Sequence, residues 1–325
     1  MNYNVLILSA GRRVELVHRF KRAAEKLNIN SSVVAVDITN TAPALYFADT
    51  FSLISKISDD RYIDDIISVC NENDIKLIVP TIDTELKKLS HYRELIESKT
   101  DAKILVSDEK VVDICSDKTL TQLFFEDNGF GVPVQYTVSE VVEGKAKFPL
   151  FIKPKDGSSS VNVFKIDNEA HLQFFADYIS DPIIQEFVSG TEYSVDVFCD
   201  FDSNPITVVP RIRLATRSGE VLKGRTCKDK AVIEDVLKVV DVLKPVGQVT
   251  IQCMKTDSGI KYIEINPRFG GGSPMSIDAG ADSCENLYRL LMGEKLSYNE
   301  NYSDSHTFIR FDSCIELDEN MVPVK

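Results

Sequence analysis

The segment Tyr262-Ile263-Glu264-Ile265-Asn266-Pro267-Arg268 alternates apolar with charged and amide side chains, as a strand with one polar face does. Alternate residues of a strand face the same side, so Glu264, Asn266 and Arg268 are expected to share one face. Glu and Asn oxygens are hard ligands that suit Mg²⁺, and Arg268 can hold a phosphate bidentately. Gln252, on the preceding predicted strand, adds another oxygen ligand. An exposed strand face would explain any one of these residues, whereas the set of four favours a metal–phosphate site.

Cations for the phosphate are expected from two other places in the chain. Lys153 ends an otherwise apolar predicted strand, Leu150–Lys153, where an ammonium group without a partner would be costly. A bound phosphate oxygen would remove that cost, and Lys118, at the start of a predicted helix, supplies a further cation. The turn after Lys153 can cover phosphate oxygens with N–H and O–H donors; its small residues are Gly157, Ser158, Ser159, Ser160 and Val161. A plain hairpin turn is the alternative for this segment.

The segment Gln185–Glu192 is predicted to form a strand, a turn and a second strand. The backbone of such a hinge, at Glu186, Phe187 and Val188, can present donors and acceptors to the edge of an adenine. Glu192 can then accept hydrogen bonds from ribose hydroxyls. A connection with two solvated acids is the alternative interpretation.

The first third of the chain alternates short apolar runs with helical periodicity, as in the predicted helix Val14–Leu27. Continuous apolar strands that alternate with helices are typical of a parallel sheet covered on both faces; the strands expected here are Val5–Leu8, Val33–Asp37, Leu77–Val79 and Ile104–Val106. Residues 1–106 are therefore predicted to form an open α/β domain. From residue 107 onward several strands follow one another without a crossover helix, which predicts an α+β region with a partly antiparallel sheet.

The loop after the first predicted strand, Ser9–Arg13, contains one glycine, whereas a dinucleotide fingerprint needs three. Arg12 and Arg13 nevertheless lie at the carboxyl end of a parallel strand, where ligands of open α/β sheets bind. They are expected either to contact an anionic second substrate or to form a solvated basic turn. Asp83 and Glu85 occupy a similar edge, where helix-capping acids are favoured.

Composition limits the classes of function. The chain has 325 residues and a net charge of −13, which argues against general nucleic-acid binding because phosphate backbones need clustered cations. No apolar run is long enough to span a bilayer, and the N-terminus lacks the features of a secretory signal, so a cytoplasmic location is expected and membrane association is not. The 7 cysteines form no CxxC pair, which makes zinc and redox motifs weak interpretations.

Together these motifs resemble the ATP-grasp superfamily, and within it the synthetase half-units of the carbamoyl phosphate synthase large subunit. The resemblance covers residues 1 to about 293. It implies an N-terminal open parallel-sheet (pre-ATP-grasp) domain at 1–106 and a two-lobed ATP-grasp domain at 107–325, with a mobile lid at about 120–187 and a C-terminal lobe at about 188–296. The resemblance also implies roles for single residues. Contacts with the ATP phosphates would come from Lys118, Lys153 and the segment Gly157–Val161, and contacts with adenine and ribose from Glu186, Phe187, Val188 and Glu192. The Mg²⁺ ligands would be Gln252, Glu264 and Asn266, and Arg268 would stabilise the transferring phosphoryl group.

Substrate specificity is expected from cations on the predicted strand Ile206–Leu214. Arg211 and Arg213 share one face of this strand, and both are expected to contact substrate or phosphate, with Arg213 also assigned to the nucleotide. A solvated strand edge is the alternative. Gly271, shortly after Arg268, could let the backbone approach an acyl phosphate, although a structural turn explains it as well.

The resemblance implies an ADP-forming ligase that uses ATP and one or two Mg²⁺ ions, with Mn²⁺ as an accepted substitute. A carboxylate would be activated as an acyl phosphate and passed to an amine or ammonia. The expected partners are therefore small molecules, with no nucleic acid and no membrane, and homodimer formation stays open. The alternatives are a catalytically weak ATP-binding regulator, an ATP-dependent phosphotransferase and a carboxylate–thiol ligase on the same fold.

Overall fold

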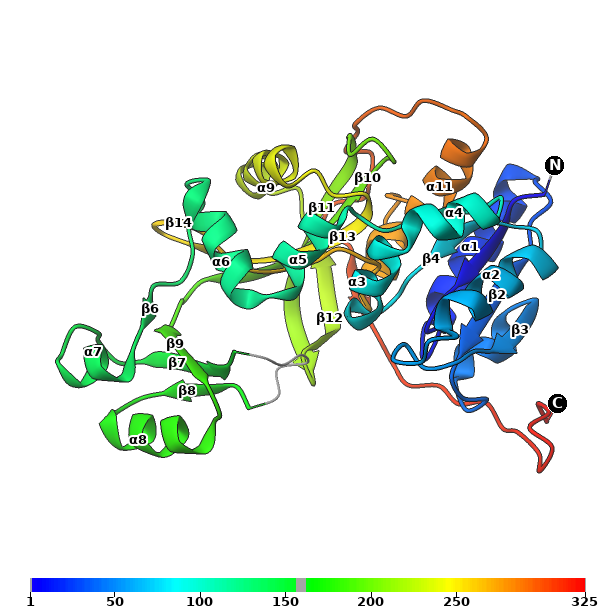
Figure 1. Cartoon of the computed structure of the whole chain (residues 1–325). Coiled ribbons are helices and arrows are strands. Elements are labelled where there is room, and N and C mark those ends of the chain that lie inside the picture. The colour runs from blue at the N-terminus through cyan, green and yellow to red at the C-terminus, as the bar shows by residue number, and fades with distance from the viewer. Residues whose placement is uncertain (1, 156–161, 325) are drawn as a thin grey trace.

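The computed structural model describes residues 2–155 and 162–324, and its N-terminal part is a parallel sheet covered on both faces (Figure 1). The strand order is β3-β2-β1-β4-β5, and each neighbouring pair is parallel. The elements are β1 (Asn4–Ile7), α1 (Val14–Leu27), β2 (Val33–Asp37), the 3-10 helix η1 (Pro43–Phe47), β3 (Thr50–Leu53), α2 (Tyr62–Glu72), β4 (Ile75–Val79), α3 (Asp83–His91), α4 (Arg93–Lys99) and β5 (Lys103–Ile104). The predicted open α/β fold of this part is confirmed.

Alternation along β1 explains why helices cover both faces. Val5 and Ile7 join the core beneath α1, whereas Leu6 points to the opposite core beneath α2 and α3. Helix α1 occupies the predicted range and buries a stripe that includes Phe20. It ends at Asn28, whose φ of 51° is one that asparagine tolerates better than most residues.

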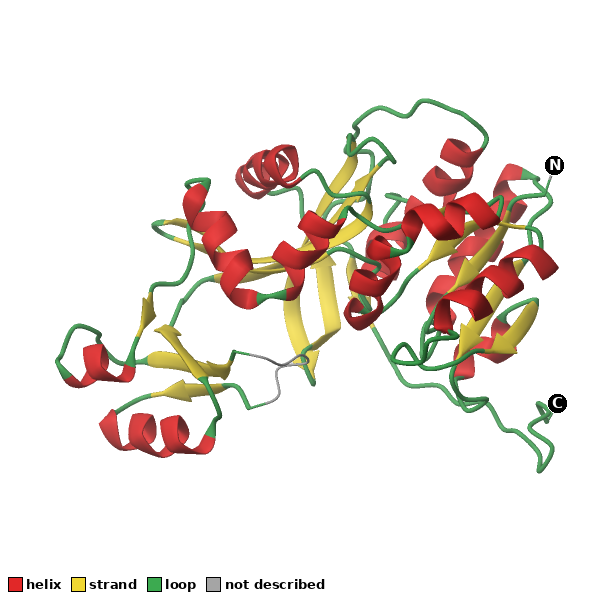
Figure 2. Cartoon of the chain, viewed as in Figure 1, coloured by secondary structure: helices red, strands yellow, loops and turns green. Residues whose placement is uncertain are grey.

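A larger antiparallel sheet follows, with the strand order β14-β13-β10-β11-β12-β15 (Figure 2). Its strands are β10 (Thr191–Cys199), β11 (Pro205–Arg217), β12 (Glu220–Thr226), β13 (Gly247–Thr256), β14 (Gly259–Asn266) and β15 (Thr307–Ile309). One face packs against α5 (Glu109–Ser116), α6 (Lys118–Asp127) and α9 (Lys230–Leu243). The antiparallel pairing predicted for this part is confirmed.

A small antiparallel sheet, with the order β6-β9-β7-β8, stands apart from the larger one in Figure 1. It consists of β6 (Gln135–Tyr136), β7 (Leu150–Pro154), β8 (Phe164–Ile166) and β9 (Pro182–Glu186), with helices α7 (Val138–Val142) and α8 (Glu169–Tyr178). It has its own apolar core around Leu150, Ile152 and Leu172. The two antiparallel sheets thus form two separate lobes, as the fold class predicted.

Helices α10 (Ser273–Asp278) and α11 (Ser283–Leu291) return the chain to the N-terminal sheet, and Figure 1 shows α11 beside α1. Leu287 and Tyr288 of α11 are fully buried in one core with Phe20 of α1 and with Phe269. Within the described residues, no helix combines the length and the apolar character that crossing a membrane requires. The shared core fixes the position of the segment that follows β14 against the N-terminal sheet.

We expect Leu287→Ala to lower the free energy of unfolding by about 2–5 kcal/mol, because it leaves a cavity in this shared core. Urea denaturation measures the loss, and Leu123→Ala on α6 is the matched control because that side chain is exposed. Equal stability of the two variants would contradict the packing described for α1 and α11.

Candidate active site

Pairing between β13 and β14 brings the predicted metal-ligating residues together. Gln252 lies opposite Glu264, and the next pair is Cys253 with Tyr262, so Ile263 is an extra residue on β14. This bulge lets both Tyr262 and Ile265 face the buried core while Glu264 faces away from it. The alternation expected from the sequence therefore applies only after the bulge.

Hydrogen bonds join these side chains into a continuous chain. The Glu264 Oε1 atom accepts from Gln252 Nε2 at 2.5 Å and from Asn266 Nδ2 at 3.0 Å. Asn266 Oδ1 in turn accepts from Arg268 Nη2 at 2.9 Å. Gln252, Glu264 and Asn266, called the ligand triad below, thus lie in direct contact, and Arg268 adjoins them.

The donor set of the ligand triad fits a hard cation. It offers one carboxylate and two amides, and a half-turn of either amide about its last side-chain bond presents an oxygen in place of a nitrogen. Among the described residues, no group of three or more His, Cys, Asp and Glu could hold a metal ion. A magnesium site in this part of the chain would therefore depend on the amide oxygens of Gln252 and Asn266.

Arg213 positions the outer end of the ligand triad. Its Nη1 donates to Gln252 Oε1 at 2.7 Å, and the same nitrogen lies 3.0 Å from Glu192 Oε1. Its Nη2 donates to the carbonyl of Gly219 at 2.8 Å. The buried guanidinium therefore links the predicted ribose ligand Glu192 to the predicted metal ligand Gln252.

Lys153 and Lys118 approach the ligand triad from other elements. Burial, and next the positive charge of Lys118, lower the pKa of Lys153 to about 8, while Glu264 opposes the shift. Lys118 Nζ donates to the Pro154 carbonyl at 3.1 Å. Within the described part of the chain, Lys153 has no hydrogen-bond or ion-pair partner, so an anion at this position would relieve an uncompensated ammonium.

The side-chain carboxylate of Glu186, the last residue of β9, is engaged in contacts within the protein. Glu186 Oε1 accepts from the Val134 backbone N–H at 2.8 Å, and the carboxylate pairs with Lys261. This leaves the backbone around Phe187 and Val188, not the Glu186 side chain, as the part suited to an adenine edge. The predicted phosphate cover, Gly157–Val161, lies outside the described residues.

Arg211 is buried and paired within the protein, on the same face of β11 as Arg213. Its side chain is 1% exposed, and it donates to both oxygens of Asp196, at 2.7 Å from Nε and 3.0 Å from Nη2. Asp196 also accepts from Thr250 and Ser276. A Cβ added to Gly272 would lie 2.7 Å from Arg211 Nη1. The glycine turn therefore packs directly against the guanidinium. The charge of the guanidinium is compensated by Asp196, as a charge buried this deeply requires.

The two arginines that precede α1 have different environments. The Arg12 side chain is 74% exposed and pairs with Asp312 at 3.3 Å. Arg13 is largely buried, and a Cβ on Gly271 would lie 2.9 Å from its Nη1. The sequence predicted the same alternatives for both arginines, yet only Arg13 lies three, four and seven residues before the buried Leu16, Val17 and Phe20. Helical periodicity could therefore have identified Arg13 as the inward-facing residue.

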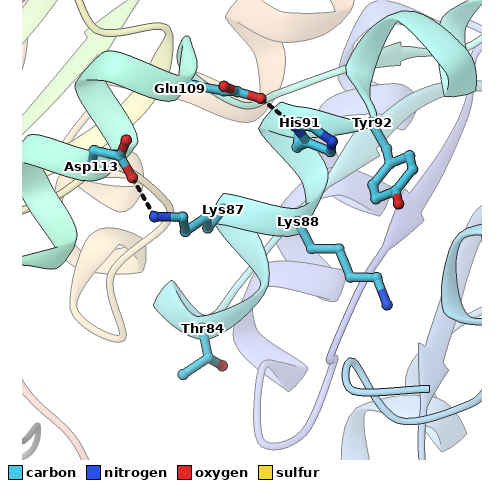
Figure 3. Close-up of a pocket in the computed structure, with 7 residues that line it drawn as sticks. All are labelled: Thr84, Lys87, Lys88, His91, Tyr92, Glu109 and Asp113. Atoms are coloured by element: carbon cyan, nitrogen blue, oxygen red, sulfur yellow. Dashed lines mark hydrogen bonds and ion pairs between the residues drawn. The ribbon is translucent and has the colours of Figure 1, made fainter. Parts of the chain in front are cut away.

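A cavity of about 360 Å³ between α3 and α5 lies outside this site (Figure 3). Lys87 pairs with Asp113 at 2.8 Å and His91 with Glu109 at 2.8 Å across it. The third cation of the cavity, Lys88, donates to the carbonyls of Ile57 and Asp59, so the charged groups of the cavity are all engaged within the protein. The cavity adds no residue to the ligand triad.

Comparison with known families identifies the class to which this fold and site belong. Residues 5–104 match the PylC-like N-terminal domain, and residues 115–272 match the ATP-grasp domain. Residues 115–272 are therefore identified as an ATP-grasp domain, as the motifs predicted, and they follow a PylC-like N-terminal domain.

Individual relatives agree with this assignment. The chain is 30% identical over 108 residues to a D-alanine–D-alanine ligase of Marinomonas sp. (strain MWYL1), covering 30% of this chain and 33% of the ligase. It is 25% identical over 221 residues to the carbamoyl phosphate synthase large chain of Agathobacter rectalis, covering 61% of this chain and 20% of the relative. The matched regions thus span a third or less of these curated relatives.

Solved structures share the fold over nearly the whole chain. The biotin carboxylase of Campylobacter jejuni in complex with β-γ-ATP has a TM-score of 0.72 at 16% identity, covering 98% of this chain and 77% of that one. The N5-carboxyaminoimidazole synthetase of Staphylococcus aureus with ADP has a TM-score of 0.70 at 16% identity, covering 92% of this chain and 80% of that one. At these identities the likeness establishes the fold.

We expect Asp196→Ala to lower the free energy of unfolding by about 3–5 kcal/mol, because it leaves the Arg211 guanidinium buried without its partner. Replacing both members with apolar residues, in Asp196→Leu/Arg211→Met, should cost less because no buried charge remains. Chemical denaturation compares the two variants. A smaller loss in Asp196→Ala than in the double variant would show that the pair is not the main support of this region.

Proposed function

We propose that this chain is an ADP-forming ligase that uses MgATP to activate a carboxylate as an acyl phosphate and passes the acyl group to an amine or ammonia. The observation that carries the proposal is the continuous contact of Gln252, Glu264, Asn266 and Arg268, with Lys153 electrostatically coupled to Glu264. A cation site, a phosphate-binding guanidinium and an uncompensated ammonium are the groups that a triphosphate requires.

ATP would lie between the two antiparallel sheets. Lys153 is on β7 of the small sheet and Glu264 is on β14 of the larger one, yet the charge of Glu264 acts on the pKa of Lys153. The phosphates would lie between these side chains. The adenine would contact the hinge backbone at Phe187 and Val188, and the ribose would contact Glu192 near Arg213.

Gln252, Glu264 and Asn266 would hold Mg²⁺, which would supply charge neutralisation for the phosphate oxygens. Lys153 and Lys118 would hold the phosphates in line with the incoming carboxylate oxygen, which forms a bond to the γ-phosphorus as the bond to ADP breaks. The amine nitrogen would then form a bond to the carbonyl carbon, and inorganic phosphate would leave. Positioning and electrostatics suffice for both steps, so no side-chain nucleophile is required.

Arg268 is suited to stabilise the charge that develops on the phosphoryl group. Its Nη2 already contacts Asn266 Oδ1 at 2.9 Å and Asp83 Oδ2 at 2.5 Å. Because Asp83 begins α3, this pair anchors the guanidinium to the N-terminal sheet domain. A guanidinium fixed in this way loses little conformational entropy when it binds the phosphoryl oxygens.

The test is ADP release by the purified chain with MgATP and a panel of carboxylic acids and amines. Release that requires both an acid and an amine, with an amide product identified by mass, would support the ligase. Nucleotide binding without turnover would instead indicate a regulator. A stable phosphorylated product would indicate a phosphotransferase, and a thioester a thiol ligase.

We expect Glu264→Gln and Arg268→Ala each to reduce substrate-dependent ADP release at least about 100-fold, because each removes a charge that acts directly on the phosphates. Glu234→Gln is the matched control because Glu234 is an exposed acid on α9. Circular dichroism checks that all three variants are folded. Near-normal turnover in either site variant would refute the assignment of the site.

The lowered pKa of Lys153 predicts the pH dependence of nucleotide binding. The ammonium form binds phosphate, so affinity is full below a pH of about 8 and falls as the pH rises through that value. We expect the Kd for MgATP to rise about 10-fold between about pH 7 and about pH 9, as measured by calorimetry. Lys153→Arg keeps its charge over this range and should show a much flatter profile. Equal slopes for the two proteins would exclude Lys153 as the titrating group.

A further inference from the structure

A second cluster of charges lies near Arg268 and contains no member of the ligand triad. Arg13, Glu220 and Arg310, called the junction cluster here, come from the start of α1, from β12 and from the residue after β15. Glu220 Oε2 lies 3.3 Å from Arg310 Nη1, and Glu220 Oε1 lies 4.0 Å from Arg13 Nη1. Arg310 Nη1 also donates to the carbonyl of Val221 at 3.0 Å. Three segments that are distant in the sequence thus place two guanidinium groups around one carboxylate.

The junction cluster carries more positive than negative charge. Burial lowers the pKa of Arg13, and the positive charges of Arg268 and Arg310 lower it further, whereas Glu220 and Asp83 oppose the change. Asp83 is already 2.5 Å from Arg268, and the nearby Asp312 pairs with Arg12 and Arg217. Glu220 is therefore the carboxylate that pairs with both arginines of the cluster. In a protein with a net charge of −13, such a local excess of cations favours an anionic ligand.

The surroundings leave room for a small ligand. A pocket of about 280 Å³ is lined by Glu220 and Arg310, and also by Arg12, Arg217, Phe311 and Asp312. Arg13 does not line this pocket but lies behind Glu220, 4.0 Å from its Oε1 atom. The adjacent Gly271 has no side chain, and a Cβ there would come within 2.9 Å of Arg13 Nη1 and 3.3 Å of Glu220 Oε1. The absence of a Cβ at Gly271 therefore lets the side chains of Arg13 and Glu220 lie close to the backbone of the glycine turn.

We propose that the junction cluster binds an amino acid as a substrate of the ligase, with its α-carboxylate on Arg13 and Arg310 and its α-ammonium on Glu220. The order of charges, a carboxylate between two guanidinium groups, matches a zwitterion better than a phosphate, because Glu220 would repel a dianion. Arg268 is not part of the junction cluster. It contacts Asn266 of the ligand triad and keeps the role proposed for it at the phosphoryl group. This assignment rests on the proposed ligase function and names its substrate class.

Calorimetry on the full chain, saturated with Mg²⁺ and a non-hydrolysable ATP analogue, tests the proposal with the common amino acids as probes. We expect at least one amino acid to bind. Its α-amide and its N-acetyl derivative should each bind at least about 10-fold more weakly, because each loses one charged contact. Failure of every amino acid to bind, or tighter binding of inorganic phosphate than of any amino acid, would overturn the proposal.

Variants locate the binding within the junction cluster. Arg13→Gln and Arg310→Gln should each raise the Kd of the amino acid about 10- to 100-fold while the Kd for the ATP analogue stays unchanged. The control is Arg61→Gln, because Arg61 is exposed and pairs only with Asp59 among the described residues. If Arg13→Gln does not fold, the more exposed Arg310 still provides the test. An unchanged Kd in Arg310→Gln would overturn the proposal.

Glu220→Gln separates recognition of the ammonium from recognition of the carboxylate. It should weaken binding of the amino acid but leave binding of the corresponding acid without the α-amine almost unchanged; equal loss for both ligands would contradict the role given to Glu220. The ligase proposal fails separately, when no acid and amine together release ADP although the amino acid still binds at Arg13 and Arg310.

Discussion

The register between β13 and β14 is the constraint on which the candidate site depends. Because Gln252 is opposite Glu264 and Ile263 is an extra residue, the ligand triad faces the small sheet while Ile265 packs in the core. A slip of one residue would exchange these faces and bury the carboxylate. The hydrogen bonds from both amides to one oxygen of Glu264 then hold the three side chains together in the absence of a cation.

Two buried arginines of β11 connect this strand to the ligand triad and to the glycine turn that follows Arg268. Arg213 links β11 to the ligand triad, and Arg211 forms a fully buried pair with Asp196 beneath the glycine turn that follows Arg268. Both guanidinium groups are on the same face of β11, as alternation requires. One contacts the groups proposed to bind nucleotide and the other supports the turn, so a single strand face serves both binding and packing.

Much of the fold could be predicted from the sequence, because apolar runs and helical periodicity are local signals that α1 and α9 follow closely. The alternation of Glu264, Asn266 and Arg268 similarly predicted one polar face. By contrast, β12 was missed because its only apolar run, Val221–Leu222, is two residues long and is flanked by Glu220 and Lys223. The burial of Arg211 could not be predicted because it depends on the distant glycine turn at Gly272. The approach of Arg310 to Glu220 likewise depends on the pairing of β12 with the distant β15.

The core shared by α1 and α11 also restricts how such a chain can evolve. The Phe20 ring meets Phe269 and Tyr288 in edge-to-face contacts, with ring centroids 6.1 Å and 5.9 Å apart. These aromatic contacts join the region that matches the PylC-like domain to residues near and beyond the end of the ATP-grasp match. Exchange of either region between relatives would leave an apolar surface without its counterpart, so the two regions are expected to be inherited together.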